Sequence, residues 1–99
     1  MKMKVVTICG SMRYSKEMIK IATDLERKKG WCIIQCVYDL NPKDLSKEEL
    51  ENIVNAHWVK IDISDAIYVV NINGYIGNST KNEINYALSK GKEVIYHEN

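Results

Sequence analysis

The chain has 99 residues, enough for one small domain, of which 45% are hydrophobic and 27% are charged. This composition is typical of a globular protein and excludes a disordered chain. Fourteen Lys and Arg residues against thirteen Asp and Glu residues leave a net charge of +1, which argues against a nucleic acid or an anionic membrane as partner. The apolar runs are far shorter than the roughly 20 residues of a membrane helix, and the amino terminus has no signal-peptide pattern. We therefore expect a cytoplasmic protein.

The first third of the chain alternates between strand and helix patterns. Residues 3–9 are rich in β-forming residues and predict a strand that stops at Gly10. Apolar side chains at helical spacing then predict a helix from a Ser15 cap to Gly30. A second strand is expected at residues 31–38, which are dense in Ile, Val and Cys.

The alternation continues to the end of the chain. Ser46-Lys-Glu-Glu49 has the pattern of a capping box and predicts the start of a second helix. Residues 66–71 are almost wholly apolar, as expected for a central strand that is covered on both faces. A third helix is expected near residues 80–90, followed by a fourth strand at residues 93–96.

This order of elements predicts an α/β fold. We expect a single small flavodoxin-like or Rossmann-like domain over residues 1–99, with three helices and a four-stranded parallel sheet in the order 2-1-3-4. In that order, ligands bind beyond the carboxyl ends of the first and third strands. The loops that emerge there are residues 10–14 and 71–80, so the topology selects these two loops as the candidate site.

The first of these loops, Cys9-Gly-Ser-Met-Arg13, has the residues of an anion site. Gly10 permits a close approach to the backbone, Ser11 offers a hydroxyl group, and Arg13 offers two parallel donors to a phosphate. The helix that follows adds free N–H groups. An ordinary strand–helix turn with a solvated arginine explains the same residues, and the loop lacks the glycine patterns of dinucleotide and P-loop sites.

The second loop leads into a helix through Gly77-Asn-Ser-Thr-Lys-Asn-Glu83. Ser79 and Thr80 are candidate helix caps that would present hydroxyl and N–H groups to an anion. Glu83 has two interpretations, either the partner of Thr80 in a capping box or a carboxylate that acts as a nucleophile. Asp65 either punctuates the turn before the third strand or handles protons in the same reaction.

The cysteines and histidines form no recognisable ligand pattern along the chain. Cys9, Cys32 and Cys36 are an odd set without a second cluster, so we expect reduced core thiols and neither a disulfide framework nor a zinc site. His57 and His97 have no closely spaced ligand residues beside them. We therefore predict no metal.

Three segments stand in order along the chain: Cys9-Gly-Ser-Met-Arg13, Asp65-Ala-Ile-Tyr-Val-Val70 and Glu83-Ile-Asn-Tyr-Ala-Leu-Ser-Lys-Gly-Lys-Glu-Val-Ile95. Together they resemble the nucleoside 2-deoxyribosyltransferase-like superfamily, and its nearest branch looks like the 2′-deoxynucleoside 5′-monophosphate N-hydrolases. The resemblance covers nearly the whole chain. Its most specific part is the Glu-x-x-x-Ala…Gly-Lys segment.

The resemblance implies a role for each matching residue. Glu83 would be the nucleophile on the anomeric carbon of the sugar, and Asp65 would assist the departing base. The other matching residues would bind the substrate, mainly through its 5′-phosphate: Gly10, Ser11, Arg13, Ser79 and Thr80. Deoxyribosyltransferases have a further aspartate in the loop after the third strand, where this chain has asparagines, and we assign Asn73 among them to substrate binding.

We therefore expect hydrolysis of the N-glycosidic bond of 2′-deoxynucleoside 5′-monophosphates, or deoxyribosyl transfer, without a cofactor. A non-catalytic module that binds or senses nucleotides is the alternative, and an interaction domain without a small ligand is a third. The expected assembly is a homodimer, because a chain of this length has little core of its own and Trp31 and Trp58 are available for an interface. The resemblance adds that such pockets are often completed by a partner subunit.

Overall fold

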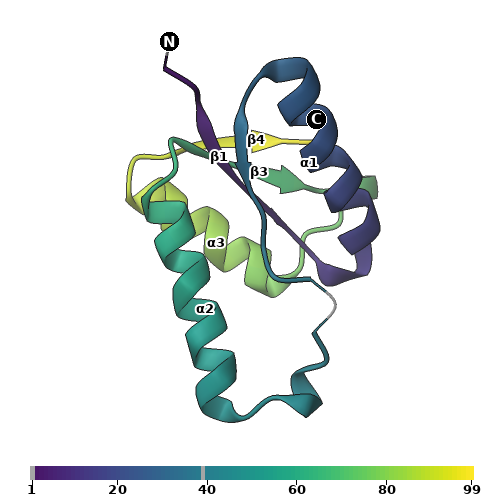
Figure 1. Ribbon diagram of the computed structural model, residues 1–99, viewed down its shortest axis with the longest axis vertical. Coiled ribbons are helices and arrows are strands. Elements are labelled where there is room, and N and C mark those ends of the chain that lie inside the picture. Colours follow the sequence, from purple (N-terminus) through teal and green to yellow (C-terminus); the bar gives the residue numbers. More distant parts are fainter. Residues whose placement is uncertain (1, 39) are drawn as a thin grey trace.

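The protein forms one parallel sheet with helical connections (Figure 1). It is known here from a computed structural model that describes residues 2–38 and 40–99. The strands are β1 (Val5–Gly10), β2 (Cys32–Ile34), β3 (Ala66–Val70) and β4 (Glu93–Tyr96). The helices are α1 (Ser15–Lys29), α2 (Lys47–Asp62) and α3 (Asn78–Ser89). The strand order is β2-β1-β3-β4 and all three pairings are parallel, which confirms the predicted α/β fold.

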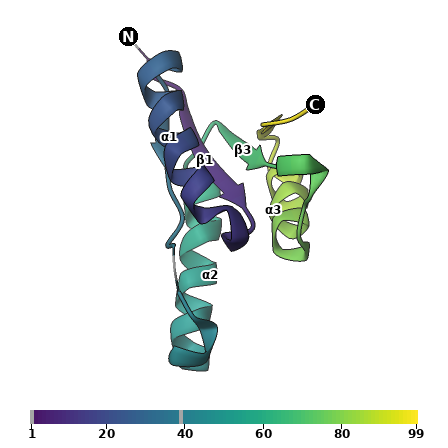
Figure 2. The same cartoon turned by 90° about the vertical axis from the view of Figure 1, so that its right-hand side faces the viewer.

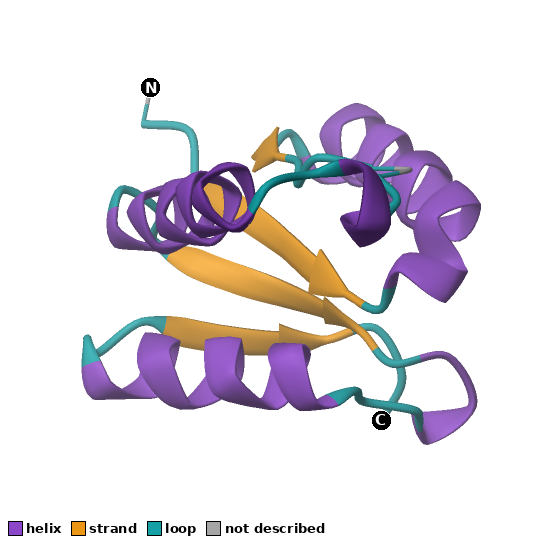
Figure 3. Ribbon diagram, turned by 90° about the horizontal axis from the view of Figure 1, so that it is seen from below, coloured by secondary structure: helices purple, strands orange, loops and turns teal. Residues whose placement is uncertain are grey.

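The sheet lies in the middle of the molecule with helices on either side (Figure 3). On one face, α1 packs Met18 and Leu25 against β1 and β3. On the other face, α2 contributes Ile61 and α3 contributes Ala87 to a second cluster. Every residue of β3 is buried, as its apolar sequence predicts for a strand between two helical layers.

The second strand is much shorter than residues 31–38. Only Cys32–Ile34 pair with β1, opposite Val5, Val6 and Thr7. The apolar residues beyond Ile34 serve other purposes, since Cys36 and Tyr38 pack against the α1-side core while the chain leaves the sheet towards α2. Their β-like composition therefore reflects burial rather than strand pairing.

Helix α2 begins as the sequence predicts, but α3 does not. Ser46 caps α2, and the reciprocal hydrogen bonds between Ser46 and Glu49 complete the capping box. Helix α3 begins earlier than expected, with Gly77 as its N-cap and no hydrogen bond from a side chain to cap it. Thr80 is instead buried inside the first turn, which makes the expected capping role of Ser79 and Thr80 wrong.

The first half of α2 and the connection before it project beyond the other elements (Figures 1 and 2). Ile61, near the carboxyl end of α2, is the buried residue of this helix. The projecting half leaves Val54 half exposed. Among the residues that the structure describes, no helix has the length and apolar character to cross a membrane.

Candidate active site

A cavity of about 400 Å³ opens where β1 ends, between α2, α3 and the connection that follows β2. This volume lies within the range of about 300–1,000 Å³ that is usual for small-molecule sites. Most of its wall is apolar. The connection before α2 contributes Val37, Leu40 and Pro42, α2 contributes Leu50, Ile53, Val54 and Trp58, and the loop after β1 contributes Met12. The remaining lining residues are Cys9, Gly10, Cys36, His57, Lys60, Ser79, Asn82 and Glu83.

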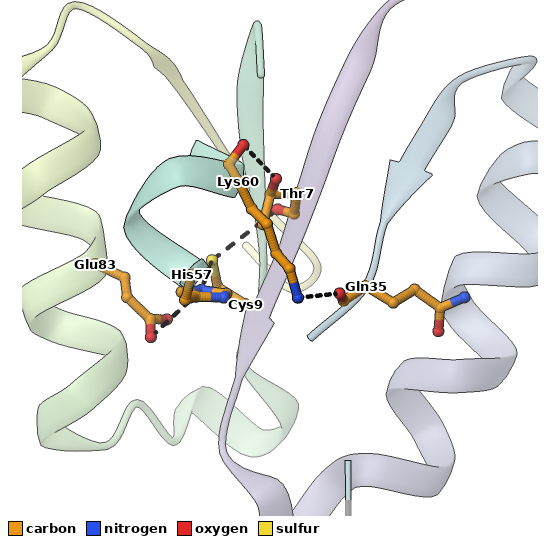
Figure 4. A network of polar contacts seen from close by, with 6 residues as sticks. All are labelled: Thr7, Cys9, Gln35, His57, Lys60 and Glu83. Carbon is orange, nitrogen blue, oxygen red and sulfur yellow. Dashed lines mark hydrogen bonds and ion pairs between the residues drawn. The ribbon is translucent and has the colours of Figure 1, made fainter. Parts of the chain in front are cut away.

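Three polar side chains meet at one side of this cavity, each from a different element (Figure 4). His57 of α2 lies between the other two: its Nε2 is 3.6 Å from Cys9 Sγ of β1 and 3.4 Å from Glu83 Oε2 of α3. The side chains of His57 and Glu83 are only 14% and 18% exposed. The imidazole ring therefore lies beside both the thiol and the Glu83 carboxylate at the cavity wall.

The Cys9 thiol carries no charge in this arrangement. Burial is the largest cause that raises its pKa well above the ordinary thiol value, and the negative charge of Glu83 raises it further. A neutral thiol beside His57 is a weak hydrogen-bond partner. The Sγ atom, the imidazole nitrogen and the carboxylate all lie within 4.8 Å of one another, and they are the groups among the described residues that could hold a metal ion.

Polar contacts at the end of α2 hold His57 in place (Figure 4). The Lys60 carbonyl accepts hydrogen bonds from Thr7 Oγ1 at 3.0 Å and from Ser64 Oγ at 2.7 Å. The Lys60 ammonium group donates to the Gln35 carbonyl at 3.0 Å, just after β2. Helix α2 is therefore attached to β1 and to the residue that follows β2, one turn after His57, and this attachment positions the imidazole beside Cys9.

The loop after β1 is compact. A Cβ atom on Gly10 would lie 3.1 Å from Met18 Sδ and 3.2 Å from Val70 Cβ, so a larger residue would push the turn away from α1 and β3. Ser11 Oγ accepts a hydrogen bond from the Arg13 backbone at 3.3 Å and caps a short 3-10 helix, Met12–Tyr14. The loop thus presents Arg13 from a fixed backbone.

Arg13 lies close to the beginning of α3. Its guanidinium group stacks on the Tyr75 ring, with 4.0 Å between the Cζ atom and the ring centroid. The Tyr75 hydroxyl lies in turn beside Gly77, 3.5 Å from where a Cβ atom would be. The exposed residues Asn78 and Ser79 open the helix there. The two predicted loops therefore meet, and they place a cation next to uncapped helical N–H groups.

Six of the eight predicted site residues lie in or next to the cavity or in the first turn of α3. Gly10, Ser79 and Glu83 line the cavity, and Ser11 and Arg13 lie beside it on the loop after β1. The buried Thr80 lies within the first turn of α3.

Two predicted residues lie elsewhere. The Asp65 carboxylate accepts a hydrogen bond from the Val5 backbone at 2.9 Å, at the amino end of the sheet. Val5 is four residues before Cys9 on β1, or about 13 Å at about 3.3 Å per residue, so the structure does not bring Asp65 to Glu83. Asn73 lies in the loop after β3, where its backbone N–H donates to the Glu98 carboxylate at 3.1 Å.

Sequence reasoning missed Cys9 and His57 as members of the site, as well as the apolar wall. Cys9 and His57 are 48 positions apart, so no local spacing reveals the pair. One signal was available: His57 follows the helical spacing of Ile53 and Ile61, which places a titratable ring on the inward face of α2. Only the fold shows that Glu83 faces the same ring.

Comparisons with known proteins give support at the level of the fold. No protein-family model matches the chain, and no curated protein does so either. Among solved structures, the chain is similar to the Clostridium botulinum CMP N-glycosidase BcmB, with a TM-score of 0.58 and 18% sequence identity over 94% of this chain and 70% of that chain. At this identity the similarity establishes the α/β fold and no more.

Proposed function

We propose that the protein cleaves the N-glycosidic bond of 2′-deoxynucleoside 5′-monophosphates, with Glu83 as the nucleophile. The observation that carries this proposal is that Glu83 lines the cavity and plays no part in capping α3, which begins at Asn78 after a Gly77 N-cap. The capping interpretation of Glu83 is thereby wrong. Its carboxylate is 18% exposed and lies 3.4 Å from His57 Nε2. Because Glu83 does not stabilise the helix end and lines a cavity, its carboxylate is available to react with a bound ligand.

The phosphate end of the substrate would lie at the start of α3. Arg13 supplies a planar charged donor, and the uncapped N–H groups around Ser79 supply further donors and the positive end of the helix dipole. No acidic residue lies in the first turn of α3. Both loops therefore favour an anion at this point, and Ser79 connects it to the cavity.

The base would occupy the apolar part of the cavity. Leu50, Ile53 and Val54 of α2 form its wall, and Trp58 adds an aromatic surface. Flat heteroaromatic bases bind well to such surfaces, since they gain apolar contact and stacking. The sugar then lies between the phosphate end and the base, next to Glu83.

The chemistry would follow that of retaining glycosidases. A Glu83 carboxylate oxygen forms a bond to C1′ while the C1′–N bond breaks, and the base leaves with that electron pair and takes up a proton from solvent. Water then attacks C1′ of the deoxyribosyl-enzyme and loses a proton to solvent, while the bond from C1′ to the Glu83 oxygen breaks and deoxyribose 5-phosphate is released. A 2′-deoxy sugar suits this path, because the absent hydroxyl makes the developing positive charge less costly. A second base in place of water would give deoxyribosyl transfer.

One observation favours the alternative of a nucleotide-binding module without catalysis. Retaining glycosidases use two carboxyl groups about 5–5.5 Å apart, and Glu83 is the one carboxylate among the described residues that line the cavity. Asp65, expected to be the second, bonds to Val5 at the far end of the sheet. In this alternative, Glu83 and His57 would contact the sugar of a bound nucleotide.

The deciding experiment incubates the protein with each common ribonucleoside and deoxyribonucleoside monophosphate and measures free base by chromatography. We expect base release from deoxynucleotides by the wild type, near-complete loss in Glu83→Gln, and full activity in the control Glu17→Gln, which changes an exposed carboxylate on α1. Titration calorimetry should show that Glu83→Gln still binds the nucleotide. Binding without base release by the wild type would reject catalysis and leave the binding module.

We further propose that the chain assembles as a homodimer through α2. Val59 and Ile63 near its carboxyl end are 56% and 64% exposed. Trp58 contributes less to such an interface than expected, because it packs on Tyr86 within the same chain at 4.6 Å between ring centroids. Light scattering at micromolar concentration should give twice the chain mass, and Val59→Lys should give the monomer. A monomeric wild type would reject this assembly.

A further inference from the structure

The cluster of Cys9, His57 and Glu83 has a second chemical meaning besides the orientation of a carboxylate. A buried thiol, an imidazole and a carboxylate from three different elements face one another, and their ligand atoms all lie within 4.8 Å of one another. We propose that these three side chains form a binding site for Zn²⁺ or a similar borderline-soft divalent cation. This goes beyond the nucleotide chemistry proposed above, and the binding itself does not depend on it.

The distances support a tetrahedral ion. Zinc bonds to sulfur at about 2.3 Å and to imidazole nitrogen or carboxylate oxygen at about 2.0–2.1 Å, so neighbouring ligands of a tetrahedral zinc lie about 3.6 Å apart for sulfur and nitrogen and about 3.4 Å apart for nitrogen and oxygen. The measured separations are 3.6 Å from Cys9 Sγ to His57 Nε2 and 3.4 Å from His57 Nε2 to Glu83 Oε2. Both match two edges of such a tetrahedron, and the separation of the imidazole nitrogen from the carboxylate oxygen is long for a hydrogen bond. The sulfur–oxygen separation lies within 4.8 Å.

The ligand types also suit zinc better than a hard cation. Mg²⁺ and Ca²⁺ take oxygen ligands, whereas a thiol and an imidazole favour Zn²⁺. Three protein ligands leave the fourth position open towards the cavity, as in zinc sites that hold a water molecule. A cation would also change the state of Cys9, since bound zinc removes the proton from a coordinating thiol.

Zinc at this site would inhibit the proposed reaction, because a metal ion bound to the Glu83 carboxylate withdraws electron density from it and lowers its nucleophilicity. That consequence rests on the proposed function. Zinc would then act as an inhibitor that competes with the nucleotide for Glu83, and removal of the metal by a chelator would activate the enzyme.

The test measures metal binding alone, without nucleotide. Protein stripped with a chelator is titrated with Zn²⁺ in competition with a chromophoric chelator, and with Co²⁺ to detect thiolate-to-metal charge-transfer absorption. We expect one ion per chain in the wild type and at least about tenfold weaker binding in Cys9→Ser, His57→Gln and Glu83→Gln, since even the loss of a supporting group costs about 10–100-fold. Cys9→Ser should also lose the charge-transfer band.

The matched control is Cys32→Ser, which removes a half-buried thiol on β2 outside the cavity and should leave zinc binding unchanged. Circular dichroism establishes that each variant is folded, and His57→Gln and Glu83→Gln decide the question if Cys9→Ser does not fold. The proposed zinc site is rejected if the wild type binds Zn²⁺ no more tightly than these two variants do. It is also rejected if Cys32→Ser weakens Zn²⁺ binding as much as they do. Base release is assayed separately in excess chelator, so a failure of the enzyme proposal and a failure of the zinc proposal give different results.

Discussion

Helices α2 and α3 both begin at the same end of the sheet as the cavity, but their amino ends are built in opposite ways. At α2, the Ser46 hydroxyl and the Glu49 carboxylate bond to backbone N–H groups, and Glu48 and Glu49 place negative charge in the first turn. At α3, Gly77 offers no side chain and the first turn has no acid. Side chains of α2 accept hydrogen bonds from the N–H groups at its own amino end. No side chain of the described residues does so at the amino end of α3.

Under the proposed function, this difference separates a helix end that stabilises the fold from one that binds phosphate. A capped helix gains stability from its own residues, and an uncapped one with Arg13 beside it gains an affinity for anions. Substitutions at the two ends should therefore affect different properties.

The largest effect should come from Arg13→Ala. Hydrogen bonds to charged groups contribute about 1.5–3 kcal/mol, so deoxynucleoside monophosphate binding should weaken about 10–100-fold in titration calorimetry. The affinity for the unphosphorylated deoxynucleoside should stay the same. Arg27→Ala, which removes an exposed arginine paired with Asp24 on α1, is the control. Equal losses for both ligands would contradict a phosphate role for Arg13.

Gly77→Asp should convert the α3 end into one like that of α2. The new carboxylate would cap the helix and repel a phosphate, so nucleotide affinity should fall about tenfold while the melting temperature stays level or rises slightly. The backbone tolerates a side chain there, with φ of −77° and the Tyr75 hydroxyl at 3.5 Å from the new Cβ. Gly77→Asn adds a cap of the same shape without charge, and a similar loss of affinity in this variant would reject the electrostatic explanation.

Ser46→Ala should lower stability at the α2 end without a change in nucleotide affinity. Loss of the N-cap hydrogen bond, 3.1 Å long to the Glu49 backbone, should lower the free energy of unfolding by about 1 kcal/mol, measured by urea denaturation. Nucleotide binding should not change. Ser79→Ala is the companion variant on α3, and it should leave stability almost unchanged because Ser79 is not a cap. A larger stability loss in Ser79→Ala than in Ser46→Ala would reverse the comparison.

The smallest effect concerns how the stability of the protein changes at acidic pH. The hydrogen bond from the Ser46 backbone lowers the pKa of Glu49 below its ordinary value of 4.5. Because the folded pKa is the lower one, the carboxylate stabilises α2 fully above about pH 4.5, and this contribution is lost as the pH falls through the folded value. Glu49→Gln should therefore flatten the decline of stability between about pH 5 and pH 3, measured as urea midpoints. If the urea midpoint falls with pH as steeply in Glu49→Gln as in the wild type, Glu49 is not the cause of the decline.

The fold follows from local patterns, whereas the site depends on contacts that no local pattern encodes. The alternation of strand and helix patterns predicts the parallel sheet and its order, which the structure confirms. The apolar run of β3 predicts a strand covered on both faces, and every residue of β3 is buried. The capping rule succeeded at Ser46 and failed at Thr80, because Thr80 is buried inside the first turn of α3. Cys9 and His57 meet only after two crossovers have formed, so tertiary structure alone could reveal them.

The residues of α2 that form the cavity wall differ from the residue that anchors this helix in the core. Leu50, Ile53 and Val54 form the cavity wall but lie outside both core clusters, and the buried anchor of the helix is Ile61 at its other end. Under the proposed function, changes of size or polarity in this wall would reshape the space for the base, and these side chains take no part in the core that covers the sheet. Under the proposed function, variants of this wall would select among bases while the two core clusters stay unchanged.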